Sequence, residues 1–381
     1  DVERRLVDLL ARHGLTARIH RSGVFATVTG PAAAVRAAFP PAAGARAATA
    51  GYQPTVPAEL APGVAGATTF DALPAVERQA PLDPAAAESA AARTGSPAGC
   101  PAGRFASTNG TTAGFTPNQY LSAYGHAALH ARGITGRGVR MALIEIDGFD
   151  PADVAAFADC FGLTVPPIAV HPVGIPQPLP AGPETTLDLQ VLAAAAPGLE
   201  AIDVYQGDSI LMPIAAAVTS ARRHPDVISM SLGGCENEQT PVGVRIINSL
   251  LMLAAGSGTT TLVSSGDEGS SGCTNADGSV LPVLAAEFPA TSPYVTAVGG
   301  TNLELDADNA IVDEWVWNGS PRNTGAGSGG QSLLFARPWW QRAGTLNVTH
   351  PNRTVPDVAA LADTGPGYAY YCTAPACVER L

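Results

Sequence analysis

Glu184 and Asp188 are the side chains whose type and spacing most strongly suggest chemistry. They lie four residues apart in a stretch, residues 182–197, that is otherwise rich in small and apolar side chains. A spacing of four places both on one face of a helix, where like charges repel unless they are used or neutralised. Two carboxyl groups with different pKa values could perform acid–base chemistry without a histidine. Acids also gather at helix starts because the helix dipole favours them, so the pair alone does not decide the function.

Two further acids are associated with predicted strands. Asp267 lies in the glycine-rich turn Ser264-Ser-Gly-Asp-Glu-Gly269 after a strand predicted at 259–264, and Glu145 lies near the end of a strand predicted at 139–146. Functional groups in such sheets gather at the carboxyl ends of the strands. Asp267 is therefore a candidate active-site residue, with an Asx turn as the alternative. Asp147, which also follows a strand, is expected to form a turn.

The elements that must position these residues form a pattern typical of an α/β protein. Apolar strands are predicted at 139–146, 201–205, 227–231, 259–264 and 294–298, and helices at 151–160, around Glu184, at 209–222 and at 242–255. This alternation predicts a mostly parallel sheet that is covered on both faces. Residues 1–40 have a separate α-β-β-α pattern, with helices at 2–13 and 32–39 and strands at 16–20 and 24–29. From Pro40 to about residue 116 the sequence is rich in Ala, Pro, Gly, Ser and Thr, which predicts a cleavable connector.

Length, charge and apolar patterning narrow the class of protein. The 381 residues are enough for one large domain and a smaller one. The net charge is −12, and all basic residues are arginine without a basic cluster, which argues against a nucleic-acid partner. No apolar run reaches the ~18 residues needed to span a bilayer. Charged residues make up only 14% of the chain, and this acidic balance suits a protein that works in acid.

The six cysteines favour disulfide bonds over a metal site. An even count on a chain rich in Gly and Pro indicates three disulfides in an oxidising compartment, although six cysteines allow 15 connectivities. The pairs we expect are Cys100–Cys160, Cys235–Cys273 and Cys372–Cys377. A zinc site is disfavoured because there is no Cys-x-x-Cys and no nearby histidine pair. Reduced thiols in the core remain an alternative.

Several segments, taken in order after the Glu184 helix, carry a family resemblance. They are Ser229-Met-Ser-Leu-Gly-Gly-Cys-Glu236, the turn around Asp267, Phe288-Pro-Ala-Thr-Ser-Pro-Tyr-Val295, Val298-Gly-Gly-Thr301, Trp315-Val-Trp-Asn318, Gly327-Ser-Gly-Gly-Gln-Ser332 and Val355-Pro-Asp-Val358. This ordered set resembles the kumamolisin-like sedolisin, or serine-carboxyl, peptidases. The resemblance implies that residues 116–381 form most of a catalytic domain with a subtilisin-like, three-layer α/β fold. It also implies that residues 1–75 are part of a small α+β, ferredoxin-like propeptide domain and that residues 76–115 are a linker or activation segment.

The resemblance also implies roles for the four acids. Glu184 matches the general base that takes the proton of a serine hydroxyl, and Asp188 matches the aspartate that bonds to it and orients it. Asp267 matches the aspartate of the oxyanion hole. Glu145 lies where some members have an additional glutamate that extends this network, whereas Leu232 stands where some members have its tryptophan partner.

The nucleophile is the main departure from the family pattern. The family carries its serine in a Gly-Thr-Ser motif soon after the Val-Pro-Asp-Val segment, and its calcium site lies beyond that serine. This sequence contains no Gly-Thr-Ser. We expect the serine and the calcium ligands beyond residue 381, on the continuation of the chain or on a second chain. The alternative is an inactive homologue that acts as a secreted binding module.

The resulting prediction is the zymogen portion of a secreted, acid-active endopeptidase that hydrolyses polypeptides. Its propeptide would act as an intramolecular inhibitor and chaperone, and a tripeptidyl-peptidase activity remains an alternative. A carboxylate base stays ionised below the range in which a histidine works, and a protonated Asp267 could donate to the developing oxyanion. A subtilisin-type catalytic triad is disfavoured because no histidine lies in a His-Gly-Thr context. A Rossmann-type cofactor-binding protein is disfavoured because no Gly-x-Gly-x-x-Gly joins a strand to a helix.

Overall fold

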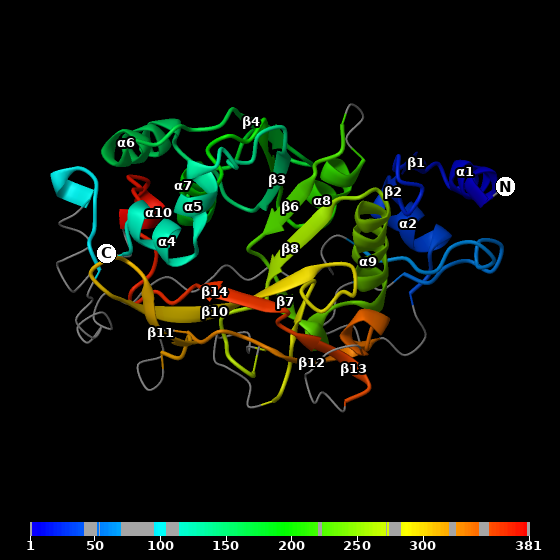
Figure 1. The fold of residues 1–381 in the computed structure, drawn as a ribbon. Coiled ribbons are helices and arrows are strands. Elements are labelled where there is room, and N and C mark those ends of the chain that lie inside the picture. The colour runs from blue at the N-terminus through cyan, green and yellow to red at the C-terminus, as the bar shows by residue number, and fades with distance from the viewer. Residues whose placement is uncertain are drawn as a thin grey trace.

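An eight-stranded, mostly parallel sheet between two layers of helices forms the main body of the protein (Figure 1). The computed structural model describes residues 2–41, 52, 54–69, 95–103, 114–219, 223–271, 273, 283–319, 325–342 and 350–378. The sheet order is β11 (Ile311–Val316), β10 (Thr296–Leu305), β8 (Thr260–Ser264), β6 (Val227–Met230), β3 (Arg140–Glu145), β5 (Ala201–Gln206) and β4 (Ile168–Pro172), and β14 (Val358–Leu361) also pairs with β10. Only the β10–β11 pairing is antiparallel among these strands. The predicted α/β fold class is confirmed.

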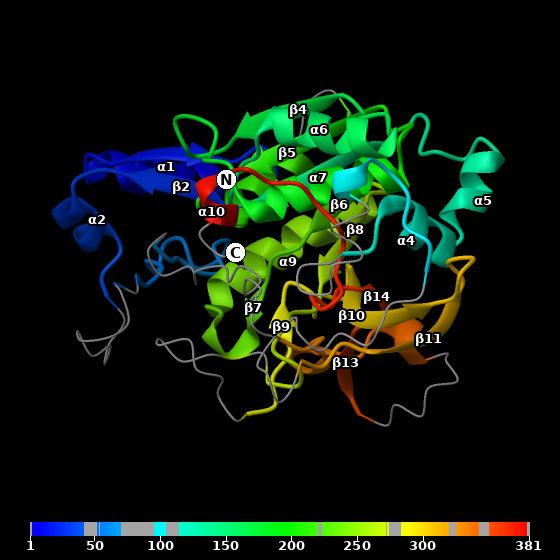
Figure 2. The same cartoon turned by 90° about the vertical axis from the view of Figure 1, so that its left-hand side faces the viewer.

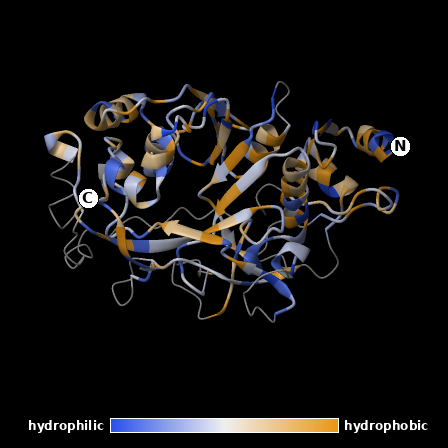
Figure 3. Cartoon of the chain, viewed as in Figure 1, coloured by the Kyte–Doolittle hydropathy of each residue, from blue (hydrophilic) through white to orange (hydrophobic). Residues whose placement is uncertain are grey.

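The two faces of the sheet are covered by different helices. Side chains of β3 alternate: Ala142 and Ile144 join the core cluster that includes α8 (Leu211–Val218) and α9 (Pro241–Gly256). Met141 and Leu143 join the cluster formed with α6 (Pro151–Phe161) and α7 (Pro183–Ala195). Successive residues of a strand point to opposite faces, so a strand that is apolar throughout is buried on both sides. Figure 3 shows the resulting concentration of hydrophobic residues in the central strands and in α9.

Several elements differ from the sequence-based prediction. The strand predicted at 294–298 is only the start of β10, which continues to Leu305. Helix α8 is shorter than the predicted 209–222, of which residues 220–222 lie outside the described part of the chain. The prediction missed the short helices α4 (Pro117–Ala123), α5 (His126–Ala131) and α10 (Pro375–Val378) and the 3₁₀ turns at Glu236–Glu238 and Trp339–Arg342. It also missed β4, β7 (Gly234–Cys235), β9 (Glu287–Phe288), β11, β12 (Gly330–Ala336), β13 (Asn352–Val355) and β14.

The N-terminal unit has the predicted α-β-β-α order. It consists of α1 (Val2–Arg12), the antiparallel pair β1 (Thr16–Ile19) and β2 (Ala26–Thr29), and α2 (Ala32–Ala38). Its own core cluster is formed by Leu9, Leu10, Leu15, Ala38, Phe39 and Leu60. Figures 1 and 2 both place this unit beside α9, at the opposite end of the molecule from α4 and α5. The ferredoxin-like topology, the propeptide role and the domain boundaries remain predictions.

The N-terminal unit contacts helices α8 and α9 through an apolar interface. Val24 and Phe25, at the turn between β1 and β2, pack against the main core cluster. Arg245 of α9 donates a hydrogen bond from Nη1 to the carbonyl oxygen of Ala65, at 3.2 Å. A cavity of about 480 Å³ remains between the two parts. Its lining includes Phe25 and Leu60 of the N-terminal unit, and Leu211 of α8.

All three expected disulfides are present, so the alternatives of a zinc site and of reduced core thiols do not hold. Cys100–Cys160 joins residues 95–103 to the end of α6, and Cys372–Cys377 closes a short loop next to α10. Cys235–Cys273 connects the segment after β6 to the segment after β8. The third bond therefore ties together two of the loops that leave the carboxyl edge of the sheet.

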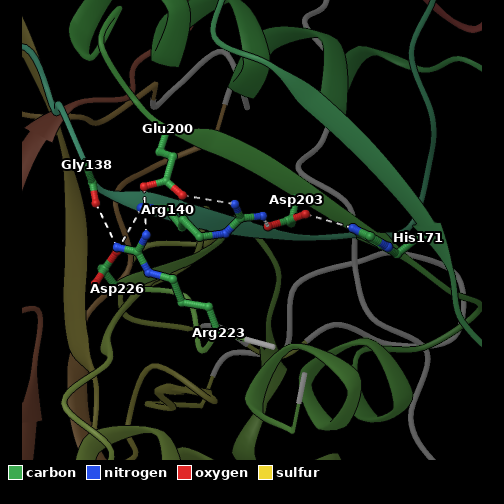
Figure 4. Close-up of polar contacts among 7 residues, drawn as sticks. All are labelled: Gly138, Arg140, His171, Glu200, Asp203, Arg223 and Asp226. Carbon is green, nitrogen blue, oxygen red and sulfur yellow. Dashed lines mark hydrogen bonds and ion pairs between the residues drawn. The ribbon is translucent and has the colours of Figure 1, made fainter. Parts of the chain in front are cut away.

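An ion-pair network begins at the amino ends of the central strands and extends along β5 to β4 (Figure 4). Arg140 at the start of β3 pairs with Asp203 at 2.7 Å, and Arg223 pairs with Glu200 at 2.7 Å. The network continues to His171, whose Nε2 lies 2.8 Å from Asp203, and to Asp226, which accepts the Arg140 amide at 2.8 Å. Positive and negative side chains are thus matched at this edge. None of the described helices is long and apolar enough to cross a membrane.

Candidate active site

The predicted acids gather at the opposite, carboxyl edge of the sheet. The chain runs from β3 outward to β4 and β5 on one side, then crosses to β6 and β8 on the other. Ligand and active sites in open α/β sheets lie where the strand order reverses in this way. Glu145 is the last residue of β3, whereas Glu184 and Asp188 lie on the first turns of α7. The predicted helix thus places the two acids next to the central strand.

Helix α7 is capped by a residue from another element. Its N-cap residue, Gly182, makes no side-chain hydrogen bond. Asp147, just beyond β3, instead accepts the backbone N–H of Glu184 at 3.3 Å and that of Thr185 at 3.0 Å. The Thr185 hydroxyl also donates to Asp147 Oδ1, at 2.7 Å. Asp147 therefore does more than form the turn expected from the sequence.

Burial and mutual repulsion raise the pKa values of Glu145, Glu184 and Asp188. Glu145 is 1% exposed and Glu184 is 7% exposed. Burial is the largest cause that raises the pKa of Glu184 well above its ordinary value, followed by the charges of Asp188, Asp147 and Asp267. For Glu145 burial again comes first, followed by Asp188, Glu184 and Asp147. Burial also raises the pKa of Asp188 to about 6. Several carboxylates cannot all ionise cheaply at such short range, so the group retains protons in weak acid.

Ser231, directly after β6, connects the two acids of α7. Its hydroxyl donates to both carboxylate oxygens of Asp188, at 3.4 and 3.3 Å. A hydrogen bond with Ser231 also lowers the pKa of Glu184, so the hydroxyl lies between the two carboxyl groups. Glu184 and Asp188, which both belong to the described part of the chain, form no direct hydrogen bond with each other. The sequence analysis singled out residues 229–236 but not the Ser231 hydroxyl. The signal for Ser231 in the sequence is that a polar residue directly follows a buried strand.

Asp267 follows β8 in a turn that the glycine-rich segment 325–329 holds in place. The backbone N–H of Ala326 donates to the carbonyl oxygen of Asp267 at 2.6 Å, and that of Ser328 donates to Gly266 at 2.9 Å. The Ser328 hydroxyl accepts the backbone N–H of Glu268 at 2.8 Å. Because the Asp267 charge contributes to the raised pKa of Glu184, its carboxylate lies near that residue. The structure therefore brings Glu145, Glu184, Asp188 and Asp267 together.

The Asp267 turn also depends on close backbone packing. Gly266 has a φ of +108°, and a Cβ placed on it would lie 1.7 Å from Glu287 Oε1. The Glu287 carboxyl group, 8% exposed, therefore rests against the backbone of the turn. Glycine is required at residue 266 both for its backbone conformation and for this approach. The Cys235–Cys273 bond then anchors the far side of the same loop.

The Val-Pro-Asp-Val segment has a structural role in this fold. Asp357 accepts two hydrogen bonds from the fully buried Arg353, at 2.6 and 2.5 Å. It also accepts the backbone N–H of Ala297, at 2.8 Å, and so fixes the start of β10. A buried guanidinium requires such a partner because an unpaired buried charge is strongly destabilising.

Calcium remains a prediction. Among the residues that the structure describes, no group of three or more His, Cys, Asp or Glu side chains could hold a metal ion. The calcium ligands were expected beyond residue 381. The catalytic roles of Glu184, Asp188, Asp267 and Glu145 likewise remain predictions.

Known proteins that resemble the chain are peptidases. Kumamolisin of Bacillus sp. (strain MN-32) is 35% identical over 270 residues, which are 67% of this chain and 47% of kumamolisin. Sedolisin of Pseudomonas sp. (strain 101) is 38% identical over 152 residues, or 38% of this chain and 25% of sedolisin. Human tripeptidyl-peptidase 1 is 30% identical over 203 residues, or 48% of this chain and 34% of that protein. The chain thus spans less than half the length of these relatives. No family model matches it.

A solved structure supports the same relationship. Pseudomonas sedolisin, a serine-carboxyl proteinase solved with two molecules of pseudo-iodotyrostatin, superposes with a TM-score of 0.58 and 25% identity. The match covers 68% of this chain and 73% of the sedolisin chain. With sequence and fold in agreement, the chain is a homologue of kumamolisin and sedolisin and belongs to the sedolisin family of peptidases.

Proposed function

We propose that the chain is the zymogen portion of an acid-active serine-carboxyl endopeptidase. Glu184 would act as the general base, Asp188 would orient it, and Asp267 would stabilise the oxyanion. The nucleophilic serine would be supplied from outside residues 1–381. The observation that carries this proposal is the burial of Glu184 at the sheet's crossover point, with Asp188, Ser231 and Asp267 as its neighbours.

The chemistry follows from the protonation states of two acids. The ionised Glu184 would take the proton of the serine hydroxyl while the serine oxygen attacks the carbonyl carbon of the peptide bond. The protonated Glu184 would then return this proton to the amine that leaves. A base with a raised pKa holds the transferred proton more strongly but is ionised over a narrower range of pH. The acidic limb of the pH–rate profile should therefore report the ionisation of Glu184.

Asp267 has the complementary requirement. It would have to be protonated to donate a hydrogen bond to the developing oxyanion, which is typically worth ~3–4 kcal/mol of barrier lowering. The Asp267 charge is one of the causes that raise the pKa of Glu184, so the two carboxyl groups interact electrostatically. Activity is expected where Asp267 is protonated and Glu184 has begun to ionise. This requirement is the physical reason for an acid optimum.

The N-terminal unit fits the role of an intramolecular inhibitor and chaperone. Its hairpin turn, through Val24 and Phe25, completes part of the main core cluster. Such packing stabilises α8 and α9 and would be lost on removal of the unit. The three disulfides suit an oxidising, extracellular location. Calcium, bound by ligands outside residues 1–381, and a second chain that carries the serine remain part of the proposal.

The decisive experiment is Glu184→Gln in the full-length gene product. Wild-type protein should cleave denatured protein at about pH 4 and process itself, and the variant should do neither. Glu200→Gln is the matched control, because Glu200 is 42% exposed and lies at the opposite edge of the sheet. A wild-type protein that lacks activity despite an intact serine would indicate a binding module instead. Product lengths would separate internal cleavage from the release of tripeptides.

A further inference from the structure

We propose that Asp147 is a positioning residue of this site: its carboxylate, fixed beyond the central strand, caps helix α7 from outside and holds Glu184 in place. The inference rests on the proposed role of Glu184. It goes beyond the expected turn-forming role, and its contacts are not those of an ordinary N-cap. The residue that caps a helix normally directly precedes it in sequence. Asp147 lies 36 residues before Pro183, the first residue of the helix it caps.

Three donors at the start of α7 converge on this one carboxylate. They are the backbone N–H groups of Glu184 and Thr185, at 3.3 and 3.0 Å, and the Thr185 hydroxyl, at 2.7 Å. The same hydroxyl lies 3.0 Å from the Asp147 carbonyl oxygen. Asp147 is only 3% exposed, so water does not compete for these contacts. The first N–H groups of a helix have no partner within the helix, and a carboxylate also complements the helix dipole.

The surrounding backbone is built to admit this carboxylate. A Cβ placed on Gly182 would lie 2.1 Å from Asp147 Oδ2, so no other residue type leaves room there. Gly148 donates its N–H to Pro180 at 2.7 Å, and Gly182 donates to Gly148 at 2.8 Å. These bonds fasten the end of β3 to the segment that enters α7. Movement of Glu184 relative to Glu145 would therefore require the Asp147 contacts to break.

The charge of Asp147 gives the contact a chemical consequence. The groups that face Glu184 are Asp188 on the same helix, Asp147 beyond β3 and Asp267 beyond β8, together with the neutral Ser231. Glu145 on β3 completes the cluster through its interactions with Asp147 and Asp188. Asp147 accepts from three donors at the start of α7, whereas the hydrogen bond that lowers the pKa of Glu184 is the one with Ser231. Repulsion from Asp147 is one of the causes that raise the pKa of Glu184, so replacing this carboxyl group by a neutral one should let Glu184 ionise at lower pH.

Two substitutions separate the two effects in the full-length gene product. Asp147→Asn removes the charge, keeps one oxygen as an acceptor and replaces the other by a donor. We expect kcat/KM at the optimum to fall about tenfold through misplacement of Glu184, with the acidic limb moved to lower pH. Thr185→Val removes the hydroxyl donor and keeps the charge, so it should lower kcat/KM without moving that limb. Asp150→Asn is the matched control, because exposed Asp150 caps α6 locally through the Ala152 amide at 2.8 Å.

A readout that needs no peptidase activity keeps this proposal separate from the proposed function. The ionisation of Glu184 can be followed by carboxyl-carbon NMR, and the protection of the Glu184 and Thr185 amides by hydrogen exchange. Asp147→Asn should move the Glu184 titration to lower pH and should weaken the protection of both amides. Asp150→Asn should do neither. An unchanged Glu184 titration and unchanged amide protection in Asp147→Asn would overturn the proposal, whether or not the wild-type protein cleaves peptides.

If Asp147→Asn does not fold, Thr185→Val decides. Weaker protection of the Glu184 amide, with wild-type protection in the last turn of α7, would support the cap. Wild-type protection throughout the helix would contradict it. Failure of the wild-type protein to cleave any polypeptide would reject the proposed function and leave these NMR results to stand for Asp147 by themselves.

Discussion

The hydroxyl of Ser231 donates to both carboxylate oxygens of Asp188, at 3.4 and 3.3 Å. It thereby links the end of β6 to the helix that carries Glu184. A donor shared between two acids stabilises their ionised forms, because a hydrogen bond to a carboxylate favours the charged state. A hydrogen bond with Ser231 lowers the pKa values of both Glu184 and Asp188.

Ser231→Ala should therefore move the acidic limb of peptidase activity to higher pH. Without the hydroxyl, the pKa values of both acids rise and Glu184 ionises later. The pH–rate profile of the full-length protein is the measurement. Ser257→Ala is the matched control, because the exposed Ser257 hydroxyl donates only to Leu253 at the end of α9, at 2.9 Å. A limb that stays in place would show that Ser231 has no electrostatic effect on Glu184.

The buried acids should make the protein less stable as the pH rises. The Asp188 pKa is raised from 3.8 to about 6 in the folded state. Between these values the folded state binds more protons than the unfolded state, so the unfolding free energy falls with increasing pH. A shift of this size corresponds to about 3 kcal/mol, present below about pH 4 and lost by about pH 6.

Denaturant unfolding of wild-type and Asp188→Asn protein between pH 3.5 and 7 measures this contribution. The variant should gain stability relative to wild type as the pH rises, because it has no carboxylate to ionise. Asp159→Asn, at an exposed position on α6, is the control and should stay within about 0.5 kcal/mol of wild type. A stability difference for Asp188→Asn that does not vary with pH would contradict the raised pKa.

Loss of the Cys235–Cys273 bond should loosen the turn that carries Asp267. The bond spans 38 residues, and loop-closure entropy predicts a loss of up to about 4 kcal/mol when both cysteines are replaced by serine. The same change at Cys372–Cys377, which spans five residues, should cost about 2 kcal/mol. Thermal unfolding and proteolysis after β8 are the measurements. Equal losses for the two double variants would argue against an ordering role for Cys235–Cys273.

Arg353→Met should be strongly destabilising even though Arg353 touches none of the four acids. The side chain is fully buried and donates twice to Asp357, so its loss removes both hydrogen bonds and leaves the Ala297 amide as a remaining donor to that carboxylate. Breaking a fully buried pair typically costs about 3–5 kcal/mol, and we expect a loss near 3 kcal/mol because the Asp357 side chain is 15% exposed. Arg12→Met is the control, because the Arg12–Glu59 pair is 58% and 47% exposed and should contribute less than about 1 kcal/mol. The losses of unfolding free energy relative to wild type should therefore differ severalfold between the two variants.

The central strands were predictable because each is apolar on both faces. β3, β5, β6 and β8 lie between two helical layers, and each carries apolar residues, although β5 also contains Asp203 and β8 contains Thr260 and Thr261. β4 is preceded by Pro167 and ends on Pro172. Proline is typical of turns, so the sequence did not predict a strand here. β11 exposes most of its side chains, so it carries no buried face for the sequence to reveal. Its position follows from pairing with the long strand β10.

The candidate site was predictable in its acids but not in its connections. The spacing of Glu184 and Asp188 follows from a single helix, which local sequence determines. Asp147 and Ser231 reach that helix from β3 and β6, and this depends on which strands become neighbours in the sheet. A polar residue directly after a buried strand is a weak signal in the sequence. Ser231 can contact Asp188 because the crossover connection places β6 beside β3.

The matched charges at the amino ends of the strands and the crowded acids at the other ends respond differently to falling pH. Guanidinium groups keep their charge in acid, so the pairs made by Arg140 and Arg223 persist until their carboxylate partners themselves become protonated. At the carboxyl edge, protonation of the acids removes the repulsion among them. Acidification thus preserves the ion pairs at one end of the sheet and reduces the repulsion at the other. The same fall in pH can therefore leave the fold intact and bring the acid cluster into the protonation state that the proposed activity requires.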